Sequence, residues 1–558
     1  MESNSTLLAA SMFSEKEALI ALFSAGKYVE LEQAAAESTK KLPQFGFGWK
    51  ALAAAQKLLG KNPLAAAKRA VELLPNDNES HNTLGLALFD VGDFHAAIEE
   101  FQEAIKIDPT YAAAYNNLGH ALYALGDIEE SIAIYRKALT INPCFFDGHS
   151  ALLHICNYDP TCNPKRMLDD ARAFGIQASK ISTHYTKWEA SSKRLTIGFV
   201  SGDFRAHSVA HFLLGVLREL RSRDGMNLVA YSNGVICDDA TTSFQKHFHL
   251  WRNIVGLADK DAAQMIHDDQ IDILIDLSGH TAHNRLPMFA WKPAPIQVSW
   301  LGYFATTGMV EIDYVLADPW TAPPGSERDF VESIWRLPET RLCFTPPQEP
   351  VDVAPLPAMQ NGGVTFGSFG ILSKMNDEVI ALWARVLHAI EGSRLMLKAK
   401  QLDEQAARMQ VQARFAQHGI DVGRLLFDGY TNRVDYLASY AKVDIVLDTF
   451  PFPGGTTTAE ALWMGVPVLT LAGNSFVSRQ GVGLLMNARL AQWIASDHDQ
   501  FVGLAVKYAG DLPRLAALRA MLRQQVLASP VFDASRFAIY FETALREMWT
   551  IWCKSNPG

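Results

Sequence analysis

The pattern of apolar and polar residues changes once along the chain, near residue 194. Before residue 150 apolar residues recur at helical spacing, and no segment has the alternation typical of a strand. After residue 194, short apolar runs rich in Val, Ile and Leu alternate with segments of helical period. We therefore expect helices over residues 1–150, a helical connector over residues 151–193 and an α/β region beyond it.

The helical region contains a repeat of 34 residues. Prolines that end the segments ELLP, KIDP and TINP, namely Pro75, Pro109 and Pro143, are equally spaced. A tetratricopeptide repeat has this length and places small and apolar residues where its two helices cross. Two units carry such residues, Leu84, Gly85, Ala97, Phe101 and Ala104 in one and Leu118, Gly119, Ser131, Tyr135 and Ala138 in the other. The unit before Pro75 is degenerate, and residues 14–43 have the pattern of a divergent helical pair.

Two series of apolar strands follow, separated by a Pro-rich segment over residues 345–363. The first series includes LTIGFV, NLVAYS, IDILIDL, PIQVSWL and IDYVLA, and the second VTFGSF, RLMLKA, RLLFDG, VDIVLD and PVLTLA. Alternating strands and helices predict parallel sheets covered on both faces. We expect two Rossmann-like, doubly wound lobes over residues 194–345 and 363–530, joined by a linker over residues 346–362. The aromatic-rich segment at 531–558 predicts a helix that packs back on the first lobe.

Composition narrows the function classes. The 558 residues are 49% apolar, which supplies material for two to four domains, and the formal net charge is −10. No long basic run is present, so we expect no nucleic-acid partner. Six scattered cysteines, no apolar stretch of membrane-spanning length and no signal-like start predict a cytoplasmic protein without a membrane span.

The segment VDIVLDTFPFPGGTTTAEALW joins a buried strand to a helix through two glycines and three threonines. An ordinary βα turn needs only small residues and one N-cap, and that explanation stays open. Gly454, Gly455, Thr456 and Thr457 offer free N–H groups and hydroxyls at a positive helix end, which favours a phosphate site. Glu460, about one turn into the helix, is then a candidate partner for ribose hydroxyls.

Histidines follow two strands of the first lobe. His207 and His211 have the spacing of a metal pair on a helix, but no acid and third ligand stand beside them. His280 and His283 follow a second strand, and each of these histidines has the alternative of an ordinary hydrogen-bonded loop residue. Because ligands of such sheets bind beyond the carboxyl ends of the strands, we expect some of these histidines to contact substrate.

Lys374 follows the first strand of the second lobe, where its cation could stabilise a departing diphosphate. Gly302, after a strand of the first lobe, permits close approach of the backbone. No DxD-like cluster marks a strand end. This combination predicts a nucleotide-sugar transferase that uses no metal and no other cofactor.

The segments GFVSGDFRAHSVAH, KPAPIQVSWLGY, DYVLADP, FGSFGILSKMND and LDTFPFPGGTTTAEALWMGVPVLTLAG occur in that order. With them the chain resembles the protein O-GlcNAc transferases of glycosyltransferase family 41 in a compact bacterial form. That family joins tetratricopeptide repeats to a glycosyltransferase of the GT-B fold. The expected fold class is therefore α + α/β, with helical repeats followed by two Rossmann-like lobes.

The resemblance implies roles for individual residues. His207 matches a histidine that positions the substrate or acts as base, and Lys374 matches the lysine that neutralises the leaving diphosphate. Thr456 and Thr457 match phosphate contacts, and Glu460 a ribose contact. The other implied contacts are Gly454 and Gly455 at the diphosphate, Thr431, Arg433 and Tyr436 at the nucleoside, and Leu301, Gly302, His211 and His280 in the sugar and acceptor pocket.

Four positions depart from the animal members of this family. Ile371, Pro453, Gly455 and Ser439 stand where those members carry Gln, Asn, His and Arg. The diphosphate contacts therefore carry over more securely than the choice of base or sugar.

The resemblance implies inverting transfer of GlcNAc from UDP-GlcNAc to Ser or Thr hydroxyls of an acceptor protein or peptide, bound between the repeats and the GT-B region. Two alternatives stay open. One is a GDP-fucose-dependent protein O-fucosyltransferase of SPINDLY type. The other is a catalytically weak scaffold whose repeats bind peptides, for which the candidate contacts are His81, Asn82, Asn116, Asn117 and His120.

Overall fold

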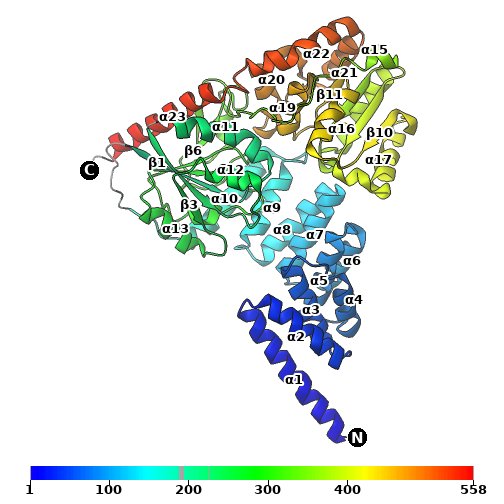
Figure 1. The fold of residues 1–558 in the computed structure, drawn as a ribbon, viewed down its shortest axis with the longest axis vertical. Helices are drawn as coiled ribbons and strands as arrows, with labels where there is room; N and C mark the ends of the chain where they lie inside the picture. Colours follow the sequence, from blue (N-terminus) through cyan, green and yellow to red (C-terminus); the bar gives the residue numbers. More distant parts are fainter. Residues whose placement is uncertain (1, 187, 189–193, 224, 557–558) are drawn as a thin grey trace. The chain divides into compact units, whose positions relative to one another are not determined.

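The computed structural model describes residues 2–186, 188, 194–223 and 225–556, which form two compact units, residues 1–148 and 149–558. The first unit is a series of paired helices without a strand in its described part (Figure 1). Its helices are α1 (Glu2–Ser24), α2 (Tyr28–Lys41), α3 (Gly46–Leu58), α4 (Leu64–Leu73), α5 (Asn78–Asp90), α6 (Phe94–Ile107), α7 (Ala112–Leu125) and α8 (Ile128–Ile141).

The predicted repeats are confirmed, and the small residues explain the helix pairing. Gly85 on α5 lies so close to Phe101 on α6 that a Cβ atom would stand 2.5 Å from the ring. Gly119 on α7 lies against Tyr135 on α8 in the same way, at 2.6 Å. Each glycine thus lets its two helices cross closely around a buried ring, which is why the pattern returns after one repeat.

The polar residues of the repeats divide into two kinds. His81 is buried, with Nδ1 2.7 Å from a carboxylate oxygen of Glu100, and the amide of Asn117 donates to Oδ1 of Asn82 at 2.8 Å. These contacts join neighbouring helices, so His81 and Asn82 have a structural role. His120 is exposed and packs beside Phe89, so it stays a candidate contact for a bound peptide.

The second unit contains two parallel sheets, as predicted. The first has the order β3-β2-β1-β4-β5-β6-β7 and the second the order β10-β9-β8-β11-β12-β13, so each winds outward from its first strand. The first sheet comprises β1 (Leu195–Ser201), β2 (Met226–Ser232), β3 (Leu250–Asn253), β4 (Ile273–Asp276), β5 (Ile296–Ser299), β6 (Tyr314–Ala317) and β7 (Ser333–Arg336). The second comprises β8 (Thr365–Ser368), β9 (Arg394–Lys398), β10 (Leu425–Asp428), β11 (Ile445–Leu447), β12 (Val468–Leu471) and β13 (Ile494–Ala495).

Helices accompany both sheets. Those of the first lobe are α11 (Ser208–Ser222), α12 (Asp239–Gln245), α13 (Asp259–Asp268) and α14 (Leu286–Phe289). Those of the second are α16 (Asp377–Ala389), α17 (Gln405–Gln417), α18 (Arg433–Ala438), α19 (Thr456–Trp463), α20 (Gln480–Asn487), α21 (His498–Ala509) and α22 (Leu512–Leu527). In the described part of the chain, no helix is long and apolar enough to cross a membrane.

Three strands, β3, β7 and β13, were not predicted from the sequence. All three lie at sheet edges, where a strand is not enclosed by neighbours on both sides. The residues of β3 and β7 are only partly buried or exposed, as in LWRN of β3, and β13 has only two residues, so none of the three has the continuous apolar run of a central parallel strand.

α9 (Phe146–Cys156) crosses the start of the predicted connector and α10 (Pro164–Lys180) lies within it, and residues 187 and 189–193 of the connector lie outside the described residues. The predicted linker carries the short α15 (Ala358–Asn361) and is held on the second lobe. Arg519 and Arg523 of α22 donate hydrogen bonds to the carbonyls of Ala354 and Val351, at 2.7 and 2.9 Å. Two carbonyls of the segment between the lobes are therefore held by α22.

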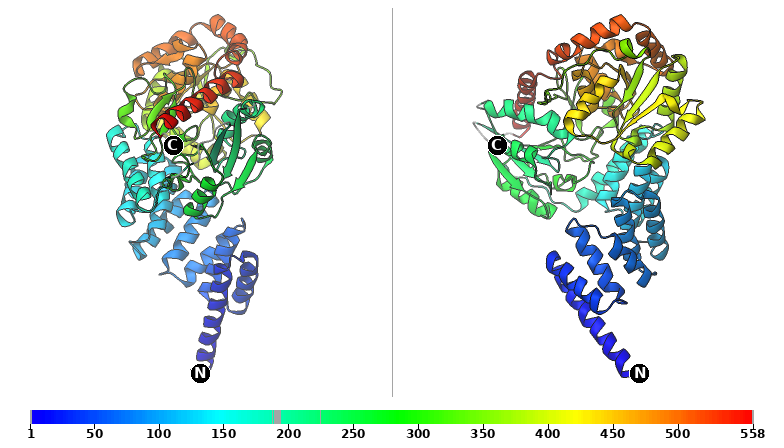
Figure 2. Two further views of the ribbon diagram at one scale, coloured as in Figure 1. Left: turned by 90° about the vertical axis from the view of Figure 1, so that its left-hand side faces the viewer. Right: turned by 45° about the vertical axis from the view of Figure 1, so that its right-hand side comes forward.

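The last helix, α23 (Ala534–Ser555), packs on α11 of the first lobe (Figures 1 and 2). Trp300, which follows β5, places its ring 5.8 and 4.7 Å from those of Phe537 and Phe541. Residues 557 and 558 of the predicted terminal segment lie outside the described residues.

Candidate active site

A cavity of about 550 Å³ lies where the carboxyl ends of the two sheets face each other. The first lobe contributes His207, Leu301 and Gly302, and the second contributes Lys374 and residues 454–458. Parallel sheets bind ligands at this edge because the loops that follow successive strands converge there. The structure thus brings together the predicted histidine, lysine and glycine–threonine turn.

The glycine–threonine turn enters α19 directly. α19 begins at Thr456 and has Gly455 as its N-cap, without a side-chain cap, so Glu460 stands about one turn into the helix, as expected. The hydroxyl of Thr458 donates to the Gly454 carbonyl at 3.1 Å, while Thr456 and Thr457 line the cavity. A helix that starts without a side-chain cap leaves N–H groups for an anion.

Asp448, which follows β11, holds this turn in place through its carboxylate. Its carboxylate accepts hydrogen bonds from the N–H of Gly454 at 2.7 Å and from the hydroxyl of Thr470 at 2.8 Å. Burial raises the pKa of Asp448 to about 6, and these hydrogen bonds partly oppose the shift. Gly454 cannot be replaced without movement, because a Cβ atom would stand 2.4 Å from the Thr457 hydroxyl.

Lys374 approaches the same turn from the end of β8. Its Nζ donates to the carbonyl of Pro453 at 3.1 Å and lies 4.0 Å from the centre of the Phe452 ring. Burial lowers the pKa of Lys374 to about 8, and the Asp448 carboxylate opposes that shift. At neutral pH the amine is therefore mostly cationic and stands beside the start of α19.

His207 is the N-cap of α11, with extended backbone angles (φ −151°, ψ 164°). Its Nδ1 accepts a hydrogen bond from the N–H of Val209 at 3.4 Å and lies 3.5 Å from Asp203. Burial lowers the pKa of His207, and Asp203 partly opposes this. The ring is consequently neutral at pH 7. Because His207 precedes the helix, it does not form an i, i+4 pair with His211 on one helix face.

The described residues contain no group of three or more His, Cys, Asp or Glu side chains that could hold a metal ion. His211 lies outside the cavity lining, with its ring 5.8 Å from that of Phe344. Burial lowers the pKa of His211 to about 4, and Arg433 adds to the shift.

The predicted nucleoside residues form a cluster beside the cavity rather than in its lining. Arg433 pairs with Glu460 at 2.5 Å and lies 3.8 Å from Glu349. Glu460 is only 1% exposed, and burial raises its pKa against the effect of Arg433. One carboxylate oxygen of Glu460, the expected ribose contact, is thus already engaged by a cation.

Two polar atoms of this cluster lack hydrogen-bond partners among the described residues, Oγ1 of Thr431 and Nη2 of Arg433. Tyr436 lies beneath Arg433, 5.7 Å from its guanidinium carbon to the ring centre. Tyr440 stacks on Phe369 at 3.9 Å and donates to the carbonyl of Thr457 at 3.2 Å. The cluster is therefore connected directly to the glycine–threonine turn.

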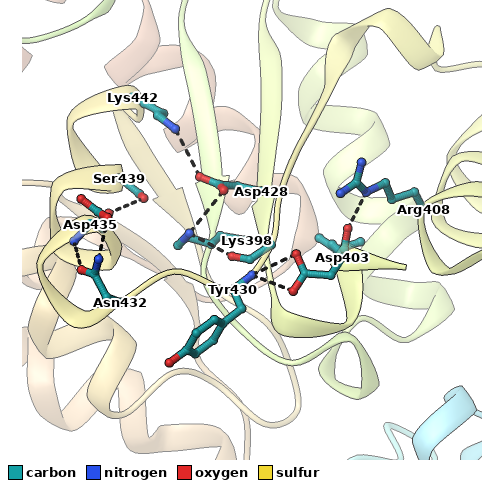
Figure 3. Close-up of polar contacts among 11 residues, drawn as sticks. Lys398, Asp403, Arg408, Asp428, Tyr430, Asn432, Asp435, Ser439 and Lys442 are labelled. Carbon is teal, nitrogen blue, oxygen red and sulfur yellow. Dashed lines mark hydrogen bonds and ion pairs between the residues drawn. The ribbon is translucent and has the colours of Figure 1, made fainter. Parts of the chain in front are cut away.

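The loop that carries Thr431 is held in place by charged side chains (Figure 3). Lys398, nearly buried, donates to the Gly429 carbonyl at 3.0 Å, and Asp403 accepts the N–H of Tyr430. The Tyr430 ring is exposed and points away from these contacts. Ser439, the residue after α18 (Arg433–Ala438), donates its hydroxyl to the Asp435 carbonyl of that helix at 2.7 Å.

His280, expected in the sugar and acceptor pocket, does not reach the cavity. It is fully buried, with Nε2 2.9 Å from the Thr307 carbonyl and Nδ1 3.0 Å from the Ser150 hydroxyl. Gly279 before it has a positive φ of 52°, and the His280 ring packs edge-on against Phe174 of α10. Burial accordingly lowers the pKa of His280 to about 3.

Leu301 and Gly302 line the cavity as expected. A Cβ atom on Gly302 would lie 2.1 Å from the Leu277 carbonyl oxygen, so only glycine fits. The sequence reasoning missed Asp448, Phe452 and Gln480, which also line the cavity. Asp448 could have been found from its position after a buried strand, whereas Gln480 carries no local signal.

Comparison with known proteins identifies both parts of the chain, the helical repeats and the two lobes. The model of glycosyl transferase family 41 matches residues 176–344 and 356–541, and models of the tetratricopeptide repeat match residues 85–126 and 112–143. The chain is 38% identical over 399 residues to a probable UDP-N-acetylglucosamine–peptide N-acetylglucosaminyltransferase, SPINDLY, of Arabidopsis thaliana, covering 70% of this chain and 44% of that protein. A second Arabidopsis protein of the same description, SEC, is 28% identical over 382 residues, or 66% of this chain and 38% of that one.

Among solved structures, the O-GlcNAc transferase of Thermobaculum terrenum, in a lysine-to-methionine mutant, matches with a TM-score of 0.83 and 31% identity. The match covers 95% of this chain and 99% of the other. In contrast, the chain spans less than half the length of the two plant proteins.

Proposed function

The chain belongs to glycosyl transferase family 41, and on this basis we propose that it transfers GlcNAc from UDP-GlcNAc to Ser or Thr hydroxyls of a protein. The transfer inverts the anomeric centre and uses no metal ion or other cofactor. The supporting observation is one cavity with Lys374 and the start of α19 on one side and His207 on the other.

The cavity supports a direct displacement. The acceptor hydroxyl attacks the anomeric carbon from the face opposite the diphosphate, and the bond from that carbon to the diphosphate oxygen breaks. Lys374 and the N–H groups at the start of α19 stabilise the negative charge that grows on the leaving UDP. The two lobes hold the acceptor and donor in line, which contributes through orientation.

His207 fits the acceptor side of this reaction. Its Nδ1 accepts the Val209 N–H, so the neutral ring carries its proton on Nε2. This arrangement favours a role in which Nε2 positions the acceptor by donating a hydrogen bond, and the acceptor proton leaves through water. A base role would require the other tautomer, with Nδ1–H directed at Asp203.

The donor nucleotide is the main open choice, because the chain is 38% identical to a SPINDLY protein and Ser439 presents no side-chain donor to a base. GDP-fucose is therefore the second candidate. A thermal-shift panel of UDP, GDP, UDP-GlcNAc and GDP-fucose, each with EDTA, separates the two. A nucleotide at about 100 times its dissociation constant adds roughly 2.7 kcal/mol to folded-state stability.

We expect UDP and UDP-GlcNAc to stabilise the protein in EDTA and an acceptor-peptide pool to gain the mass of GlcNAc. Stabilisation by the guanosine compounds alone would replace the donor. Stabilisation by neither pair, or only after magnesium is added, would contradict the proposal. Tight UDP binding without transfer to any peptide would favour the scaffold alternative, in which the repeats bind peptides.

A further inference from the structure

Gln480 lies in the wall of the cavity, and none of the roles above uses it. It is the first residue of α20 and is 2% exposed, yet it lines the cavity beside the glycine–threonine turn. Its Oε1 has no hydrogen-bond partner among the residues that the structure describes. A buried amide oxygen without a partner is uncommon in a folded protein and calls for an explanation.

The position of the amide follows from the absence of a side chain at Gly455. A Cβ atom on Gly455 would lie 2.7 Å from Nε2 of Gln480 and 3.9 Å from its Oε1. Gly455 has a φ of −108°, so no left-handed backbone conformation demands glycine here. The space beside Gly455 is instead occupied by the amide of Gln480, with its N–H₂ group nearest the turn.

The start of α20 is packed closely against the residues that support the glycine–threonine turn. A Cβ atom on Gly481 would meet Thr470 Oγ1 at 2.5 Å and Asp448 Oδ2 at 2.9 Å. These are the two residues whose hydrogen bond supports the Gly454 N–H contact. The close approach of Gly481 therefore holds the Gln480 backbone at a constant distance from the turn.

We propose that Gln480 binds the donor: its Nε2 donates a hydrogen bond to the diphosphate beside Gly455, and its Oε1 accepts one from a hydroxyl of the sugar. This inference rests on the proposed function and adds a residue that selects among donors. Burying an amide oxygen without a partner costs free energy. A residue with only a structural role here would avoid that cost, because an apolar side chain of the same length fills the space without an unpaired oxygen.

The test compares Gln480→Met and Gln480→Glu with the parent in the full chain, by calorimetric titration with UMP, UDP and UDP-GlcNAc. Hydrogen bonds to charged groups correspond to roughly a tenfold to hundredfold change in affinity. We expect Gln480→Met to weaken UDP and UDP-GlcNAc by about tenfold or more while UMP binding is unchanged. Gln480→Glu places a carboxylate near the diphosphate and should weaken UDP further. Gln525→Met, an amide on α22 that donates to the Ala488 carbonyl at 2.8 Å, is the matched control.

A double-mutant cycle checks the geometry. Gly455→Ala should weaken UDP binding in the parent, because the new methyl group displaces the amide, and should cost less in a Gln480→Ala background. Equal UDP affinity of the parent and Gln480→Met, an equal loss for UMP and UDP, or an additive cycle would each overturn the inference. If the parent binds neither UDP nor GDP, the proposed function falls as well. If it binds them and the Gln480 variants bind equally well, only the role of Gln480 is rejected.

Discussion

Raising the pH through 8 should weaken the binding of nucleoside diphosphates, because Lys374 loses its proton in that range. Burial lowers the pKa of this amine to about 8 in the free protein. The protonated form is the one that attracts the diphosphate. Its folded pKa is depressed, so the binding-competent cation is present at neutral pH and is lost as the pH rises above 8.

The expected size follows from the protonated fraction. An amine with a pKa of about 8 is about nine-tenths protonated at pH 7 and about one quarter protonated at pH 8.5. If only the cation binds the diphosphate well, the apparent dissociation constant for UDP rises about fourfold over this interval. Lys374→Arg keeps its charge throughout the interval, since the arginine pKa exceeds about 12, and should remove the pH dependence.

Isothermal titration of UDP at pH 7.0, 7.5, 8.0 and 8.5 measures this change. Lys374→Met should bind UDP weakly and with a flat profile, and Lys507→Met, which removes an exposed lysine of α21, should match the parent. Ionisation of the uracil ring of UDP affects every variant equally, so the difference between the parent and Lys374→Met isolates the contribution of the Lys374 amine. A parent profile parallel to that of Lys374→Met would refute the assignment of Lys374 to the diphosphate.

Three other predictions concern different parts of the chain. Arg433→Met leaves Glu460 buried without its cation and should lower the free energy of unfolding by about 2–3 kcal/mol in urea titrations at pH 7. This loss is below the range for a fully buried pair because Arg433 is about one-third exposed. The loss should shrink at lower pH, where Glu460, whose pKa is already raised, takes up a proton. His207→Asn should lower the turnover number by roughly 100-fold with little change in the UDP-GlcNAc dissociation constant, and an equal change in both would contradict its place on the acceptor side. Gly119→Ala places a methyl group against Tyr135 and should destabilise the repeats by about 1–3 kcal/mol, seen by thermal unfolding, whereas Gly503→Ala, with open space around it, should be neutral or stabilising.

Much of the fold could be predicted because its signals are local. The 34-residue period is visible in the sequence because Gly85 and Gly119 must each face a large ring. Central strands such as β4 and β5 are visible because they are buried at every position and mostly apolar. The edge strands β3 and β7 could not be predicted in this way, since their mixed residues are stable only once a neighbouring strand pairs with them.

The site could be predicted in part for a similar reason. Lys374 and the Gly454–Thr457 turn follow central strands directly, and parallel topology alone brings such residues to one edge. The same rule failed for His280, because its ring is held by the Ser150 hydroxyl and the Thr307 carbonyl away from the cavity. It could not find Gln480, which reaches the cavity only through the packing of Gly481 on Asp448.

Arg433 and Lys374 differ in which groups already bind them, and this difference supports the roles proposed for them. Arg433 is held by the Glu460 carboxylate, so much of its charge is balanced within the protein. Lys374 has a carbonyl and a ring face as its contacts, and none of the described carboxylates lies within ion-pair distance of its Nζ. Neutral partners are displaced by a diphosphate at little electrostatic cost, because the incoming charge is far stronger than theirs. In the proposed reaction, Lys374 is therefore the cation that can follow charge onto the leaving group, and Arg433 would offer the nucleotide base only its unpaired Nη2.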